Sequence, residues 1–414
     1  MEAIEIIALS ISSALATACG IGGGAVYSSF LLGVQDFEPS EAFPISICII
    51  MFCGVITFIN RIIDKYEHPK SNFVNYELSI LFGPAMILGV KFGTICNMIL
   101  NKLILTFLLA AILVNSIFKN LKNIHKTKEK EEKYDQELLM AENNGGLEEA
   151  LIPKSQRKTF NEIISNTERG QILTSDEKSL LKQDEMPLRP GRLAFILVLQ
   201  ILLLGDQLLE GNLNLSSWIG VVRCSSTYWF IFGGYIVVSI IMLLIGYKMA
   251  KTHFNLRKKI PVKYSGLKLD YLNDHIYSII FNAFLTGLMS PTVGLGGGMI
   301  LNPILANLGL EPKEASSTSN FLVISNSIAS TILFLCSGQL NFTFTILLGT
   351  PCIICAFIGS FFILSYISRT KKSSFLLVIM FYIMISSLFL LGFKIYLEWD
   401  NINIGGLLMI NPYC

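Results

Sequence analysis

Long runs of apolar residues dominate the chain and predict a bundle of membrane-spanning helices. A bilayer core of roughly 30 Å needs about 20 mostly apolar residues in a helix. Runs of about that length occur at about 43–60, 77–100, 102–118, 193–209, 227–249, 317–336, 342–367 and 373–397. Two further stretches, about 3–34 and 276–310, are too long for one straight span and are interrupted by glycine clusters. The pattern predicts an all-α, polytopic transmembrane protein.

Composition agrees with this prediction and excludes several soluble classes. The 414 residues are 52% hydrophobic and 15% charged, whereas a typical soluble domain is roughly 25% charged. Residues 119–192 hold 28 of the 62 charges, so the other 340 residues carry too few to cover a water-soluble surface. A cytosolic enzyme, a secreted disulfide scaffold and a nucleic-acid-binding protein are therefore excluded.

Polar and apolar stretches divide the chain into five regions. They are a first membrane unit (1–118), a polar loop (119–192), an extra transmembrane hairpin (193–249), a basic connection (250–275) and a second membrane unit (276–414). The loop has no sustained apolar periodicity, so we expect it to be cytoplasmic and mobile, with a short charged helix near 126–139.

Lys and Arg residues beside the spans predict which ends face the cytoplasm. Basic residues at 61–70, at the start of the polar loop and at 248–263 can all be cytoplasmic if 77–118 and 193–249 are hairpins. The acidic segments 33–42 and 308–315 are then expected on the opposite side.

One basic group disagrees with this orientation. The same count of spans places Arg369, Lys371 and Lys372 on the side opposite to the other basic connections. Because Lys and Arg favour the cytoplasmic side, these three residues conflict with the predicted topology.

An internal duplication is the most informative feature of the sequence. Three blocks recur in the same order: GIGGG (20–24) with GLGGG (294–298), FEPSEAFPIS (37–46) with LEPKEASSTS (310–319), and GPAMILGVKFG (83–93) with TPCIICAFIG (350–359). Chance similarity of three blocks in one order is improbable. We therefore predict two homologous repeats of one membrane unit.

The glycine clusters predict helices that break within the membrane. Glycine destabilises a helix by about 1 kcal/mol per residue, and irregular backbone at membrane depth is tolerated only where it is buried in protein or lines a cavity. Transporters built from repeats bind substrate at such breaks, and a helix N-terminus there would attract a small anion. Close helix packing is the alternative. Neither cluster is followed by Lys-Ser/Thr, which argues against a nucleotide-binding loop.

Around these breaks the chain resembles the TauE/SafE sulfite-exporter-like permeases. The family's two halves each have a glycine-rich break followed by Pro…Ala-x-x-(Thr/Ser)-Ser, and the resemblance spans 1–118 and 276–397. Here the elements are GIGGG with Pro39, Ala42 and Ser46, and GLGGG with Pro303, Pro312, Ala315, Thr318, Ser319 and Asn320. The first half has Pro44-Ile45 where the second has Ser317-Thr318. The polar insert is similar to that of longer eukaryotic members. The resemblance implies transport of sulfite, organosulfonates or related sulfur-containing anions.

Polar residues within the predicted spans are the candidates for substrate binding. Lys91 is the most isolated charge, expected to counter an anion or to change protonation; snorkelling or pairing with a carboxylate is the alternative. Hydroxyls and amides after the second break could donate to an oxyanion, with interhelical hydrogen bonding as the alternative. The predicted substrate-binding residues are Gly20, Gly22, Gly23, Gly24, Ser46, Lys91, Gly294, Gly296, Gly297, Gly298, Asn302, Thr318, Ser319, Asn320 and Asn326.

We therefore predict a multi-pass membrane permease for a small anion that works by alternating access. No enzymatic chemistry, cofactor, metal or nucleic acid is expected. Protons are a candidate coupling ion, through Lys91 or the substrate's own protonation, and homo-oligomerisation is left open. The alternatives are a permease for a different small anion, and a membrane scaffold or receptor that recruits partners through its charged loop.

Overall fold

A computed structural model describes residues 3–18, 22–67, 74–143, 186, 188–211, 216–258, 275–310, 312–370 and 374–398. Within these ranges all regular secondary structure is helical. The helices are α1 (Ala3–Ala18), α2 (Gly24–Gly33), α3 (Pro39–Glu67), α4 (Tyr76–Ile99), α5 (Lys102–Asn143), α9 (Pro190–Glu210), α10 (Ser226–Lys258), α12 (Ile276–Val293), α13 (Gly298–Asn307), α14 (Pro312–Ser337), α15 (Phe342–Thr370) and α16 (Ser374–Glu398).

Nine of the described helices are long and apolar enough to cross a membrane. The apolar segments are Pro39–Tyr66, Tyr76–Ile99, Lys102–Glu129, Pro190–Glu210, Ser226–Asn255, Ile276–Val293, Lys313–Ser337, Phe342–Phe362 and Leu377–Tyr396. The apolar helices Glu5–Thr17 and Gly24–Gly33 are shorter. The prediction of an all-α, multi-pass membrane protein is confirmed.

Helix α5 is longer than the sequence pattern suggested. It continues from its membrane segment to Asn143 without interruption, so the polar loop begins as part of this helix and not with a separate one near 126–139. Residues 102–143 contain neither glycine nor proline, and their Lys, Glu, Leu and Gln residues favour helix. The rest of the loop, apart from residues at its end, lies outside the described residues.

Asparagine residues start several of the long helices. The side chain of Asn75 accepts a hydrogen bond from the Leu78 amide at 3.2 Å, and that of Asn101 accepts one from Leu103 at 3.1 Å. Such caps satisfy amides that have no carbonyl partner within the helix. They explain why α4 begins at Tyr76 and α5 at Lys102, directly after these asparagines.

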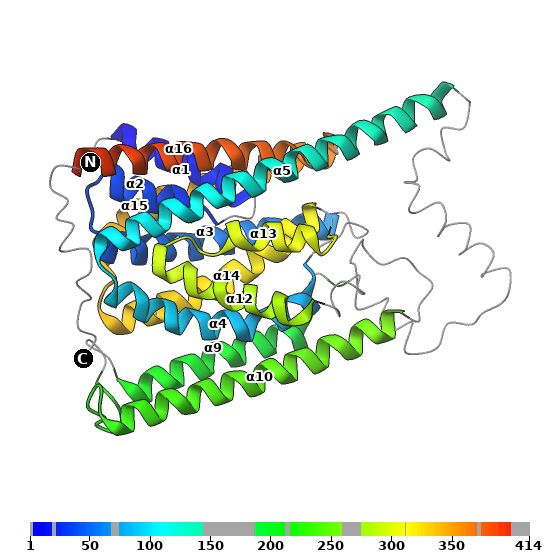
Figure 1. The fold of residues 1–414 in the computed structure, drawn as a ribbon. Coiled ribbons are helices and arrows are strands. Elements are labelled where there is room, and N and C mark those ends of the chain that lie inside the picture. The colour runs from blue at the N-terminus through cyan, green and yellow to red at the C-terminus, as the bar shows by residue number, and fades with distance from the viewer. Residues whose placement is uncertain are drawn as a thin grey trace.

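Each glycine-rich segment lies between two helices that together return to the side on which they began. The side-chain amide of Gln35, which follows α2, donates to the carboxylate of Glu5 near the start of α1 at 2.7 Å. The start of α1 and the end of α2 therefore lie at the same end of the bundle. At the other end, Asn75 donates to Glu314 at 3.2 Å, which places the start of α14 beside the start of α4. Figure 1 shows the two hairpins, α1–α2 and α12–α13, within the bundle.

This return of α12–α13 corrects the predicted topology. Lys313 pairs with Asp64 at 2.7 Å, so the segment 308–315 lies at the end of α3, among the basic connections and not opposite them. The prediction counted 276–310 as one net crossing, whereas the glycine break reverses the chain. Cys224, in the connection between α9 and α10, is disulfide-bonded, which is typical of the non-cytosolic side.

The corrected path also removes the conflict at Arg369. The Asn60 amide donates to the Phe357 carbonyl at 3.0 Å and to the Ser360 hydroxyl at 2.6 Å. The second half of α15 therefore lies beside the end of α3, and α15 ends on the side of the other basic connections. The prediction that placed Arg369 on the opposite side is wrong for the same reason.

The bundle centres on α3 and α14, with the same order of helices before and after the extra hairpin. Helix α12 packs mainly on α4, and α1 packs mainly on α15. Figure 1 shows α9 and α10 (green) along one edge and α5 (cyan) with α16 (red) along the opposite edge. This arrangement is compatible with two repeats, and the common origin of the halves stays a prediction.

Candidate functional site

The two glycine breaks lie against each other. A Cβ added to Gly24 would lie 2.5 Å from the carbonyl carbon of Leu295. Gly22 and Gly296, one from each break, both lie against Ile50 of α3 and Val323 of α14. The breaks therefore cross near the middle of the two central helices, and a substrate site between them stays a prediction.

The backbone at each break requires glycine. Gly23 precedes α2 with φ 76° and Gly297 precedes α13 with φ 87°, both in the left-handed region that side chains disfavour. The amides of Ile300 and Leu301 donate to the Gly297 carbonyl at 3.1 Å, so α13 begins immediately at the break. The first backbone amides of a helix have no carbonyl partner within the helix, and they form the positive end of the helix dipole.

Ser46 connects the two breaks. Its hydroxyl lies 2.9 Å from the Gly294 carbonyl oxygen and 3.4 Å from that of Gly24. The hydroxyl of Ser28 lies 3.1 Å from both Ser46 and the Gly294 carbonyl. Sequence reasoning placed Ser46 near the breaks, and its observed contacts hold them together.

Asn326 is the most distinctive polar residue at the second break. Its side chain is buried, and neither amide atom has a hydrogen-bond partner among the described residues. The amide nitrogen would lie 3.7 Å from a Cβ at Gly297. Ser290, just before the break, has a buried hydroxyl that likewise lacks a partner there. Buried unsatisfied polar groups cost about 1–3 kcal/mol each, so they mark a place where a ligand would gain binding energy.

The start of α14 is engaged in contacts between helices. Thr318 accepts a hydrogen bond from the Asn75 amide at 2.9 Å, and the Asn320 side chain donates to the Gly54 carbonyl at 3.2 Å. Thr318 is eight residues before Asn326, or about 12 Å along the helix. In this structure the side chains of Thr318 and Asn320 therefore form hydrogen bonds between helices, which is the alternative to substrate binding.

Arg61 is a residue that sequence reasoning did not select. Its guanidinium donates to Ser316 at 2.8 Å and to Ser317 at 2.6 Å. These hydroxyls lie at the basic end of the bundle, away from the breaks. Of the other predicted residues, Ser319 is buried on α14 and Asn302 is half-buried on α13. Gly20 lies outside the described residues.

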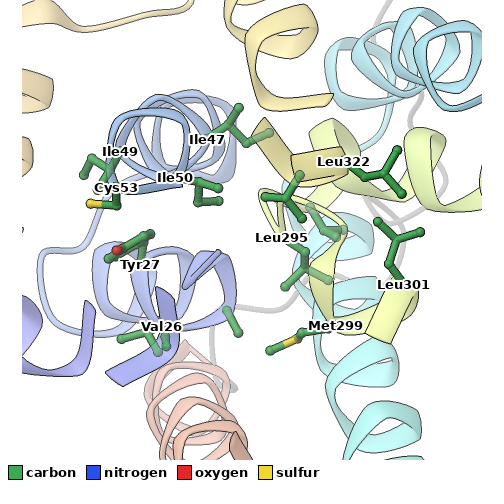
Figure 2. Close-up of a cluster of buried hydrophobic side chains, with 14 of the residues drawn as sticks. Val26, Tyr27, Ile47, Ile49, Ile50, Cys53, Leu295, Met299, Leu301 and Leu322 are labelled. Carbon is green, nitrogen blue, oxygen red and sulfur yellow. The ribbon is translucent and has the colours of Figure 1, made fainter. Parts of the chain in front are cut away.

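Apolar side chains surround the crossing of the breaks. Figure 2 shows Val26 and Tyr27 of α2, Ile50 of α3, and Leu295 and Met299 near the second break in one cluster. Within the described residues no group of three or more His, Cys, Asp or Glu side chains is placed to hold a metal ion. The chemistry of the crossing is therefore that of backbone amides, a few hydroxyls and one side-chain amide.

Comparison with known proteins finds similarity to one family of membrane proteins. A family model described as "Sulfite exporter TauE/SafE" matches residues 215–390. The chain is 23% identical over 380 residues to Sulfite exporter TauE/SafE family protein 1 of Arabidopsis thaliana, covering 88% of this chain and 77% of the relative. It is 24% identical to family protein 3 of that plant, covering 87% and 71%.

The chain is related to the TauE/SafE family. No solved structure gives a significant match. The matched family and these relatives are named for sulfite export, which agrees with the prediction of a membrane transporter and not of an enzyme. The resemblance noted around the glycine breaks thus extends over most of the chain.

In this TauE/SafE relative, Lys91 faces away from the breaks. Its neighbours Gly89 and Gly93 lie against the backbone of α12, and residues two apart in a helix point in nearly opposite directions. Lys91 donates to Asp206 and, at 2.8 Å, to Glu210, both on α9. Lys91 is thus paired with carboxylates, which was the alternative to an anion-binding role. The anion-binding role stays a prediction.

Sequence reasoning missed Asp206 and Glu210, although a signal was present. They are four residues apart at the end of an apolar run, so they share one helix face. An acidic pair with this spacing in a span suits an interior position, and a lone lysine in another span is its natural partner.

A second ion-pair network fastens the extra hairpin at the basic end. The buried Glu77, at the start of α4, lies 3.1 Å from Arg189 and 3.2 Å from Arg192 at the start of α9. His253 of α10 lies 3.5 Å from the same carboxylate. Two arginines at the start of α9 thus compensate one buried acid, and His253 of α10 lies beside the same carboxylate, so this network links α9 and α10 to α4.

Proposed function

We propose that this protein is an alternating-access permease for sulfite or a related small sulfur-containing anion, bound between the N-termini of α2 and α13. The relatives' names support this substrate class, since each is called a sulfite exporter family protein. The observation that carries the location is the unpartnered, buried amide of Asn326 beside Gly297.

The proposed site suits a small oxyanion. The first amides of α2 and α13 supply donors and the positive ends of two helix dipoles. Asn326 adds a side-chain donor, and Ser290 adds a hydroxyl. Sulfite offers three oxygen acceptors on one small centre, so it can receive hydrogen bonds from both helices without an arginine.

The opposite entry of the two hairpins supports alternating access. The hairpin α1–α2 enters from one end of the bundle and α12–α13 from the other, and they meet at the crossing. We propose that one half rocks against the other, so that the anion site opens to each side in turn. The apolar cluster in Figure 2 would separate the site from water between these states.

Flux of radiolabelled sulfite in proteoliposomes tests the proposal, with sulfate, an organosulfonate and chloride as competitors. We expect saturable flux that is lost in Gly297→Leu, because Thr286 and the left-handed backbone leave no room for a side chain. Gly392→Leu is the matched control, since a Cβ there meets nothing within 4 Å. Wild-type flux in Gly297→Leu would exclude the central site. Absence of flux for every anion, from folded protein, would favour the scaffold alternative.

A further inference from the structure

The cluster of Lys91, Asp206 and Glu210 has no part in the proposed binding step. The three side chains are only 3–5% exposed. They lie toward the ends of α4 and α9 that face away from the basic connections. Gln207 contacts both carboxylates, at 3.4 Å from Asp206 and 3.5 Å from Glu210.

The charges in this cluster do not balance. One ammonium faces two carboxylates, so full ionisation would bury a net negative charge, which is unfavourable in a poorly solvated interior. The Lys91 ammonium lies 4.7 Å from the Phe232 ring centroid and 4.5 Å from that of Tyr235, so aromatic rings enclose its free side. One added positive charge would neutralise the cluster.

Within the part of the chain that the structure describes, no second buried cation adjoins the cluster. Arg223 lies on the wall of a small adjoining pocket, is half-buried and donates to the Met98 sulfur at 4.0 Å. The ionisable groups that face the cluster or its pocket are Lys91 of α4, Tyr228 and Tyr235 of α10, and Arg223 of the α9–α10 connection. From α14 only the apolar Leu333 lines this pocket.

We propose that Asp206 and Glu210 together hold one exchangeable proton. A metal cation fits poorly, because it needs several oxygen ligands, whereas these oxygens already accept hydrogen bonds from Lys91 and Gln207. The pocket lined by Glu210 has polar and apolar walls and room for water, which would give the proton a route toward the non-cytosolic side. When the proton leaves, the pair gains one negative charge beside Lys91.

Helix α4 connects this proton site to the second break. The side-chain amide of Asn97 donates to the carbonyls of Pro291 and Thr292 at 3.3 and 3.1 Å, directly before the break. Lys91 and Asn97 belong to one rigid helix, so a shift of α4 caused by the charge change reaches the anion site. This coupling step rests on the proposed function, whereas the presence of the proton does not.

Infrared spectroscopy of the purified protein tests the proton directly. We expect a protonated carboxylic-acid C=O band that shifts in D₂O and is lost in Glu210→Gln or Asp206→Asn. Glu38→Gln is the matched control, because Glu38 also pairs with a lysine, Lys102, but is exposed. A band unchanged in both buried-pair variants would overturn the proposal, and each variant alone can decide if the other fails to fold.

Transport assays then test the coupling. In wild-type proteoliposomes we expect a pH gradient to drive sulfite accumulation, and in Glu210→Gln we expect loss of that accumulation while labelled sulfite still exchanges with unlabelled sulfite. Accumulation in Glu210→Gln equal to wild type would overturn the coupling. Absence of both exchange and accumulation in the wild type would instead refute the proposed function, and the infrared result would still decide the proton.

Discussion

The hydroxyl of Ser46 lies 2.9 Å from the carbonyl oxygen of Gly294, although 248 positions separate the two residues. This contact joins α3 to the backbone of the second glycine break. It therefore links the helices before the extra hairpin to those after it, at the crossing of the two breaks.

Ser46→Ala should loosen the crossing of the breaks. The Gly294 carbonyl would keep only Ser28 as a side-chain donor, and loss of a buried hydrogen bond costs about 1 kcal/mol. We expect a lower Tm in scanning fluorimetry together with reduced sulfite flux. Ser12→Ala is the control, since that exposed hydroxyl bonds only within its own helix. An unchanged Tm would show that Ser46 does not support the crossing.

Gly24→Ala should prevent correct assembly of the halves. Its Cβ would lie 2.5 Å from a backbone carbon of Leu295 and 2.6 Å from the Gly294 oxygen, and backbone atoms cannot move aside as a flexible side chain can. Such overpacking costs about 3 kcal/mol or more. We expect little monodisperse protein in size-exclusion chromatography, whereas Gly392→Ala should behave as wild type. Normal yield and flux in Gly24→Ala would contradict the observed crossing.

Asn326→Leu should weaken sulfite binding without lowering the stability of the protein. Its amide has no partner, so replacing it removes an unsatisfied group worth about 1–3 kcal/mol. We expect an unchanged or higher Tm but a weaker apparent affinity for sulfite, by about tenfold if one hydrogen bond to the anion is lost. Asn320→Leu should instead lower the Tm, because it loses its bond to the Gly54 carbonyl. Equal sulfite affinity in wild type and Asn326→Leu would remove Asn326 from the site.

Glu77→Gln should release the extra hairpin. It would leave Arg189 and Arg192 without their shared carboxylate charge, and breaking a buried ion pair costs about 3 kcal/mol. We expect a lower Tm and faster hydrogen exchange in the first turns of α9. The exposed pair of Glu38 and Lys102 should contribute less than about 1 kcal/mol, so Glu38→Gln serves as the reference. Unchanged exchange in α9 would argue against this fastening.

The corrected topology can be tested by labelling single added cysteines with an impermeant maleimide. We expect Lys313→Cys to react from the cytoplasmic side, because Lys313 pairs with Asp64 at the basic end. Asp36→Cys should react from the opposite side, since Asp36 is exposed and pairs with Lys394 there. Labelling of both positions from one side would contradict the return of the α12–α13 hairpin.

The sequence by itself determined the membrane spans and the glycine breaks, because both follow from local properties. The length of an apolar run decides whether a helix can cross a bilayer, and consecutive glycines such as Gly296 and Gly297 disfavour a continuous helix. Ser46 and Asn326 were selected as polar residues within predicted spans, and their part in substrate binding stays a prediction.

Only the tertiary structure decided how these elements pair and which way they run. The reversal of 276–310 depends on the backbone angles at Gly294–Gly297, so counting spans gave the wrong side for 308–315 and Arg369. Lys91 finds Asp206 115 positions away because α9 packs on α4. A contact of this kind depends on the rotation and depth of two helices, and periodicity within either helix cannot specify both.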